Sequence, residues 1–209
     1  ELTQAGSDNQ QLKPMSQKTR EALAGELETI VADAGYSNGE QIRDLQSSKY
    51  EVAVPSNRAV NNQGAGKHFQ KSDFTYLPEE DAYRCPAGQL LHHKTVSNKD
   101  RMHLYARSGC NQCPVQHQCT KADRRWVSRH FDEEALDDAD NAATPQRMLR
   151  RMATVEPTFA TLKRLLNKGR FTCWGLESAG SEYSLGVLSY NLMRAINVLG
   201  VKGMMARLA

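Results

Sequence analysis

Residues 29–42 read TIVADAGYSNGEQI, an apolar run that ends at an aspartate, Asp33. Thr29–Ala32 is short, apolar and partly β-branched, which is typical of a buried strand. Aspartate favours turns, so a turn alone would account for Asp33. The alternative is that its carboxylate has a function, and the residues that follow bear on this choice.

A helix and a second strand follow the turn. Ser37 and Glu40 fit a capping box at the start of a helix, which we predict over 38–48. Residues 50–54, YEVAV, are predicted as a second strand. Strand, helix and strand form a βαβ unit with parallel strands, and Asp33 would lie at the carboxyl end of the first strand. Ligands bind at that edge of open α/β sheets, so Asp33 is a candidate functional residue.

Length, composition and charge limit the function classes. The chain has 209 residues, enough for one core or a core with a small insertion. It contains no apolar run long enough to cross a bilayer and no signal peptide, so we expect a cytoplasmic protein without a membrane partner. The net charge is +3, but residues 146–209 carry ten Lys or Arg against three Glu. That segment is either a solvated helix face or a surface for a phosphate-rich partner.

We divide the chain into three predicted domains. Residues 1–54 carry a helix at about 17–27 and the βαβ unit. Residues 55–142 contain a polar loop, short β-like runs with four of the five cysteines, and an acidic run. That acidic run, 132–140, has six acids in nine residues and is expected to be a solvated linker. Residues 143–209 are predicted to be helical.

Four cysteines have the spacing of a metal site: Cys85, Cys110, Cys113 and Cys119. A C-x2-C pair can present two thiolates to one tetrahedral metal, and the other two cysteines would complete the ligand set. Such a zinc site is structural, because four thiolates leave no open coordination position. The alternatives are reduced cysteines that pack as small hydrophobes, an iron–sulfur cluster, and disulfides, which nothing in the sequence favours. Cys173 is expected to be a core thiol.

The second candidate carboxylate is Glu156, in the stretch MATVEPTFATLKRLLNKGRF. Thr154 is predicted as the N-cap of a helix with Pro157 in its first turn, where proline is tolerated. The alternative is an unbroken helix from Pro145, which Pro157 would kink. Complementation of the helix dipole would by itself account for Glu156 at a helix start.

Glu156 and Lys163 are seven residues apart, so on a helix they project from one face at a distance of about 10 Å. A final helix is predicted over 181–199. Its apolar stripe indicates a buried core face, formed by Leu185, Leu188, Leu192, Ile196 and Leu199.

Taken together, four stretches resemble the DDE transposases of bacterial insertion sequences: IVADAGYSNGEQI, CPAG with CNQCPVQHQC, VEPTFATLKRLLNKGRF, and the terminal YNLMRAINVL. They cover nearly the whole chain in the expected order. The resemblance implies an α/β, ribonuclease H-like fold in which three carboxylates hold two divalent ions, Mg²⁺ or Mn²⁺. It identifies Asp33 as the second carboxylate and Glu156 as the third. The residues between them would include an inserted cysteine-rich β subdomain.

The resemblance also implies a function, DNA strand cleavage and transfer by two-metal phosphoryl transfer. Its partners would be DNA, as element ends and as target, with a homodimer as a further candidate. Lys163 matches the family's lysine that holds DNA near the site. Arg151 is assigned in place of an arginine that relatives have at the position of Met152. The other candidate DNA-binding residues are Arg164, Lys168 and Arg170.

The family's first Asp should lie well upstream of Asp33. Asp8 is only 25 residues before it, in a polar segment, and is not assigned to that role. We therefore expect an N-terminally truncated chain that lacks one metal ligand and is inactive alone. The competing hypothesis is a non-catalytic, zinc-stabilised nucleic-acid-binding protein or a decayed transposase remnant. Convergence of Asp33 and Glu156 in space would favour the enzyme.

Overall fold

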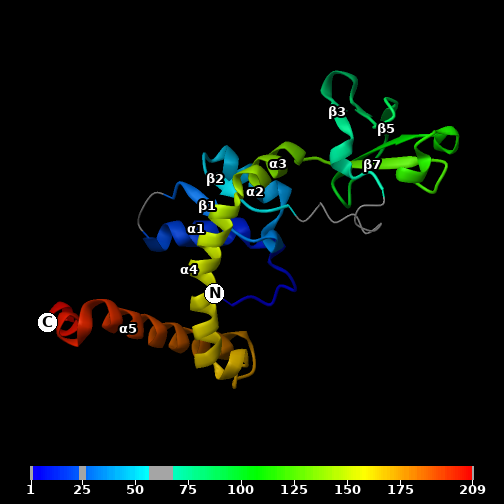
Figure 1. Ribbon diagram of the computed structural model, residues 1–209. Coiled ribbons are helices and arrows are strands. Elements are labelled where there is room, and N and C mark those ends of the chain that lie inside the picture. Colours follow the sequence, from blue (N-terminus) through cyan, green and yellow to red (C-terminus); the bar gives the residue numbers. More distant parts are fainter. Residues whose placement is uncertain (1, 24–26, 57–67, 209) are drawn as a thin grey trace. The chain divides into compact units, whose positions relative to one another are not determined.

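The computed structural model describes residues 2–23, 27–56 and 68–208 and has both helices and sheets, which confirms the predicted α/β class (Figure 1). The chain forms two compact units, Asn9–Thr144 and Glu1–Asp8 with Pro145–Ala209. The three-domain division stays a prediction. Among the described helices, none has the length and apolar character needed to cross a membrane.

The predicted βαβ unit is present in the Asn9–Thr144 unit. It consists of β1 (Thr29–Val31), α2 (Gly39–Ser47) and β2 (Glu51–Ala53). The two strands pair in parallel, with Ile30 opposite Val52. This confirms the strand, helix and strand order, and Asp33 follows β1 at its carboxyl end.

The N-cap of α2 differs from the prediction. Asn38 is the N-cap, and its side-chain oxygen accepts a hydrogen bond from the backbone N–H of Gln41 at 3.1 Å. Ser37 instead ends the preceding 3₁₀ turn, η2 (Ala34–Tyr36), where its backbone N–H donates to the carbonyl of Ala34. The predicted capping box was wrong. Serine and asparagine are both good N-cap residues, and because Ser37 ends the preceding turn, the next residue, Asn38, caps α2.

Two further helices cover the parallel strands. The first is α1 (Leu12–Leu23), which begins before the predicted range of 17–27; residues 24–26 lie outside the described part of the chain. The second is α3 (Glu133–Ala142), formed by the acidic run that was expected to be a solvated linker. Their apolar side chains join those of α2, β1 and β2 in one buried cluster: Leu12, Ala32, Ile42, Leu45, Val52, Val54, Leu136 and Ala139.

The rest of this unit is an antiparallel sheet of five strands, each paired with the next along the chain (Figure 1). The strands are β3 (Thr75–Leu77), β4 (Ala82–Arg84), β5 (Leu90–Ser97), β6 (Met102–Arg107) and β7 (Arg125–His130). The register between β5 and β6 shifts between His93 and Thr95. One face carries a second buried cluster, formed by Phe74, Tyr83, Leu91, Tyr105 and Val127.

The other unit is mainly a pair of long helices, α4 (Pro145–Leu165) and α5 (Leu176–Leu208), with a non-helical Gly200 inside α5. The helix α4 is continuous, so Thr154 is not an N-cap and the alternative of an unbroken helix holds. The Thr154 hydroxyl donates within the helix, to the carbonyls of Arg150 and Arg151 at 3.0 Å.

Short 3₁₀ turns complete the described elements: Asp8–Gln10, Ala34–Tyr36, Lys71–Asp73, Pro78–Glu80, Cys110–Gln112, Gln116–Gln118 and Asn167–Gly169. The helices α4 and α5 contact each other through the hydroxyls of Thr158 and Tyr190, which are 3.1 Å apart. Nearer the connecting loop, Gly186 lies against Leu166: a Cβ added at Gly186 would lie 2.9 Å from Leu166 Cδ2. Glycine therefore permits this close approach of the two helices.

The apolar stripe of α5 is not buried, contrary to the prediction. Leu185 and Leu188 are 65% and 62% exposed, and Leu192 and Ile196 are also exposed. Helical spacing correctly indicated that these residues share a face, but spacing alone does not say what covers that face.

Candidate active site

Asp33 occupies the position that the βαβ unit predicted. It follows the buried Ala32 and caps the turn η2, with its Oδ1 accepting a hydrogen bond from the backbone N–H of Gly35 at 3.0 Å. The carboxylate is half-buried. A capping role thus exists locally, and it also orients the carboxylate at the carboxyl edge of the parallel strands.

Glu156 lies on α4, exposed, one residue before Pro157. Lys163 is exposed on the same helix, which continues unbroken between the two residues. Their separation of seven residues along a continuous helix corresponds to about 10 Å and one face. Of the apolar residues near Lys163 in this segment, Leu162 and Leu166 are buried, whereas Phe159 is 51% exposed.

The remaining predicted DNA-binding residues follow Glu156 or precede it closely. Arg151 is half-buried on α4, and Arg164 is exposed in its last turn. Arg170 is exposed after the 3₁₀ turn η7 (Asn167–Gly169), and its backbone N–H donates to the carbonyl of Leu166. The side chain of Lys168 lies outside the described residues.

A structured loop after η7 was not predicted as functional. The carboxylate of Glu182, on α5, accepts hydrogen bonds from the backbone N–H and hydroxyl of Thr172 and from the backbone N–H of Cys173, at 2.9–3.2 Å. These bonds hold the pKa of Glu182 below its ordinary value, although desolvation opposes them. The loop presents Trp174, which is 95% exposed. Cys173 is exposed as well, so its assignment as a core thiol was wrong.

Asp33 and Glu156 belong to different units of the chain. Their convergence, and with it the shared metal site, therefore stays a prediction.

The four predicted zinc ligands, by contrast, belong to one unit and line one cavity of about 330 Å³: Cys85, Cys110, Cys113 and Cys119. All four are reduced and half-buried. Burial raises the pKa of the Cys119 thiol, Arg125 lowers it, and the other three cysteines raise it further. Within the described residues, no three His, Cys, Asp or Glu side chains already form a metal-binding group.

A polar cluster on the five-stranded sheet also escaped prediction. Asp81 Oδ1 accepts hydrogen bonds from the hydroxyls of Tyr105 at 2.6 Å and Tyr76 at 2.9 Å. These bonds lower the pKa of Asp81, with smaller contributions from His93 and His103. Burial and the bond to Asp81 raise the pKa of Tyr105 above its ordinary value. None of these three side chains lines the cavity at the cysteines or the groove along α5.

Ion pairs join α3 to the sheet and to α2. Asp132, 3% exposed at its side chain, pairs with Arg43 at 2.6 Å and with Arg101 at 2.9 Å. Glu133 pairs with Lys71 and accepts a hydrogen bond from the backbone N–H of His130. The start of the acidic run is therefore a buried connection, which a count of charges in the sequence could not distinguish from a solvated one.

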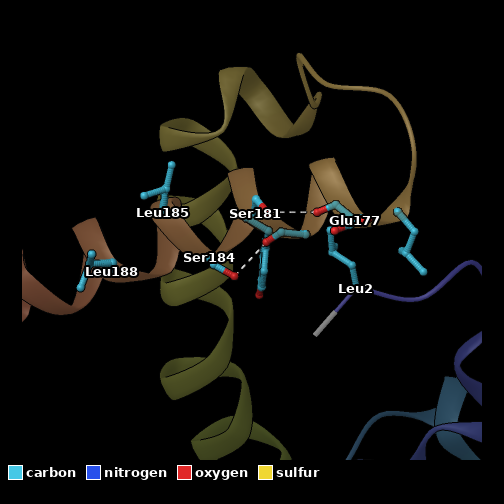
Figure 2. Close-up of a pocket in the computed structure, with 9 residues that line it drawn as sticks. Leu2, Glu177, Ser181, Ser184, Leu185 and Leu188 are labelled. Atoms are coloured by element: carbon cyan, nitrogen blue, oxygen red, sulfur yellow. Dashed lines mark hydrogen bonds between the residues drawn. The ribbon is translucent and has the colours of Figure 1, made fainter.

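An open apolar groove of about 710 Å³ lies along α5 (Figure 2). Its leucines include Leu185 and Leu188, which project from the helix in Figure 2. The hydroxyls of Ser181 and Ser184 donate to carbonyls of their own helix, at 3.2 and 2.8 Å. Among the described residues, the groove is lined by one carboxylate, Glu177, and by no His, Lys or Arg.

Comparison with protein families gives one match. Residues 84–196, more than half of the chain, match the family model of the transposase DDE domain. The match includes the four clustered cysteines, Glu156 and Lys163, whereas Asp33 precedes it. Neither the curated proteins nor the solved structures gave a match. The chain therefore belongs to the transposase DDE domain family.

Proposed function

We propose that this protein is a DNA transposase whose chemistry is metal-dependent phosphoryl transfer at Asp33 and Glu156. The observation that carries the proposal is the family match, which includes Glu156 and the helix around it. The position of Asp33 after the first of two parallel strands supports it, because that edge is where α/β sheets bind ligands. In this proposal the βαβ unit is part of a ribonuclease H-like core, and the five-stranded sheet is the inserted cysteine-rich subdomain.

The donor atoms at both positions suit a hard divalent cation. Asp33 offers a half-buried carboxylate oriented by the N–H of Gly35, and Glu156 offers an exposed one. Carboxylate oxygens bind Mg²⁺ or Mn²⁺ in preference to softer metals. When bound, such ions activate an oxygen nucleophile and stabilise charge on the leaving oxygen of a phosphodiester.

The DNA-contacting surface would lie on α4 and the loop that follows it. Lys163, Arg164 and Arg170 supply exposed positive charge for the phosphates. Arg151 and Lys168 extend this basic set along the chain. Trp174 adds an exposed aromatic ring on a loop that Glu182 holds, and such rings stack on bases. The loop thus pairs phosphate contacts with a stacking surface.

Iron-directed cleavage of the polypeptide tests whether the two carboxylates share an ion. Fe²⁺ added in place of Mg²⁺, with ascorbate and hydrogen peroxide, cuts backbone close to the bound iron. We expect fragments that end near residues 33 and 156, both suppressed by excess Mg²⁺. Asp33→Asn or Glu156→Gln should abolish both cuts, and Asp138→Asn, an exposed acid on α3, should abolish neither.

Magnesium-sensitive cuts at only one of the two positions, or at neither, would contradict a shared metal site. If the cuts are absent and Asp33→Asn and Glu156→Gln bind duplex DNA as tightly as the wild-type chain, a non-catalytic nucleic-acid-binding protein is favoured.

A further inference from the structure

The four clustered cysteines come from two connections at the same end of the five-stranded sheet. Cys85 lies in the turn between β4 and β5, and the other three lie in the longer connection between β6 and β7. The pairing of Arg84 with Leu90 and of Arg107 with Arg125 closes both connections at that end. The antiparallel order of the strands therefore brings cysteines that are far apart in sequence to the same end of the sheet.

The side chains in the cavity wall that could bind a metal ion are of one kind, cysteine thiols. Among the described residues, the lining of this cavity includes no His, Asp or Glu, and the four thiols are the strong metal ligands there. The other lining residues include Phe69, Phe74 and Leu91, which are apolar, and two cations, Arg107 and Arg125. Four thiolates around a divalent ion carry a net charge of −2, and two arginines oppose that charge. Thiols that only packed as small apolar groups would carry no charge for the two arginines to balance.

Two backbone features support thiolate ligands. The backbone N–H of Gln89 donates to Cys85 Sγ at 3.4 Å, within a tight turn in which Gly88 has φ of 75°. Such N–H donors to sulfur orient and stabilise a coordinating thiolate. The Cys110–Gln112 turn places Cys113 beside Cys110, with a 3.1 Å bond between the Cys113 N–H and the Cys110 carbonyl.

A buried donor in the cavity wall lacks an acceptor. Arg125 donates through its Nη atoms to the carbonyls of Cys119 and Phe69, at 3.4 and 3.1 Å. Its Nε is buried and has no hydrogen-bond partner among the described residues. A buried donor without an acceptor is costly, and a thiolate of the cluster would supply one.

We propose that Cys85, Cys110, Cys113 and Cys119 bind one structural zinc ion that closes this end of the five-stranded sheet. Zinc with four thiolates is tetrahedral and has no open position, so the ion takes no part in phosphoryl transfer. The turns that carry the four thiols line one cavity, which gathers the ligand set at one place. The site shares no residue with the proposed carboxylate site, and this proposal holds whether or not the protein cleaves DNA.

Metal analysis of the purified, reduced chain tests the proposal. We expect about one zinc ion per chain, as a four-cysteine site would hold. Cys113→Ser should lose nearly all of the zinc. Cys173→Ser, an exposed cysteine in the other unit, should retain it and serves as the matched control.

Cobalt substitution of the wild-type chain covers the case in which Cys113→Ser fails to fold. Co²⁺ in a tetrahedral thiolate site gives intense visible absorption, which added Zn²⁺ should abolish. Chelation should lower the melting temperature of the wild-type chain, because zinc affinity contributes to folding. Zinc content that is the same in Cys113→Ser and wild type, bound iron, or disulfides among these cysteines would each overturn the proposal.

Discussion

Arg101 Nη2 and Asp132 Oδ2 are 2.9 Å apart, in an ion pair that connects the turn between β5 and β6 to the start of α3. Arg43, on α2, binds the other carboxylate oxygen at 2.6 Å. One buried carboxylate thus links the five-stranded sheet to the βαβ unit.

Asp132→Asn should destabilise the Asn9–Thr144 unit by about 1–3 kcal/mol, because an amide cannot accept from both guanidinium groups. Urea unfolding followed by circular dichroism measures the change. The control Asp138→Asn, exposed on the same helix, should change stability by less than about 0.5 kcal/mol. Equal effects of the two variants would show that the ion pairs contribute nothing to stability.

The Asp81 cluster predicts a loss of stability in acid. Hydrogen bonds from Tyr105 and Tyr76 lower the folded pKa of Asp81 below its unfolded value of about 3.9. A lowered pKa contributes stability above the unfolded pKa, and that contribution is lost as the pH falls through the folded pKa. Urea midpoints of wild type and Asp81→Asn should therefore converge below about pH 4. A difference that stays constant from neutral to acid pH would contradict this origin.

The α4–α5 contact predicts opposite outcomes for two glycines of one helix. Gly186→Ala should be destabilising by about 1–3 kcal/mol through overpacking against Leu166, less the gain in helix propensity. Gly180→Ala meets open space and should stabilise the helix by about 0.5–1 kcal/mol. Thermal unfolding of both variants measures the difference, and a stabilising Gly186→Ala would exclude the close packing.

Lys163 predicts a change in salt dependence. Lys163→Ala should weaken binding to duplex DNA similarly for all sequences and reduce the slope of log affinity against log salt by about 1, as loss of one phosphate contact does. Fluorescence anisotropy over a salt series gives the slope. The control is Lys202→Ala, at an exposed lysine on α5. The same change of slope in this variant would mean that net charge, and not a phosphate contact of Lys163, sets the salt dependence.

Local patterns predicted the βαβ unit well, because its strands and helix are set by residues close in sequence. The apolar run before Asp33 predicted β1, and YEVAV at 50–54 predicted β2, each from a few adjacent residues. The predicted N-cap of α2 was wrong by one residue. Ser37 and Asn38 are both favourable N-cap residues, and only the position of the turn η2 decides between them.

Features that depend on distant partners were not predictable. The spacing of Leu185 and Leu188 showed a shared face, yet nothing local says whether another element covers it. The burial of Asp132 depends on arginines about 30 and 90 residues away, which no window of sequence contains. The cysteine spacing indicated a shared metal ion. That Cys85 and Cys119 line one cavity depends on the order of the strands, which the spacing does not give.

The sheet order β3-β4-β5-β6-β7 follows the order of the chain. Strands that pair are therefore neighbours along the chain, and such local contacts lower the contact order and favour fast folding. Domains fold as units during synthesis, from the N-terminus onward. The five strands can accordingly pair once β7 has emerged from the ribosome, before α4 and α5 have emerged.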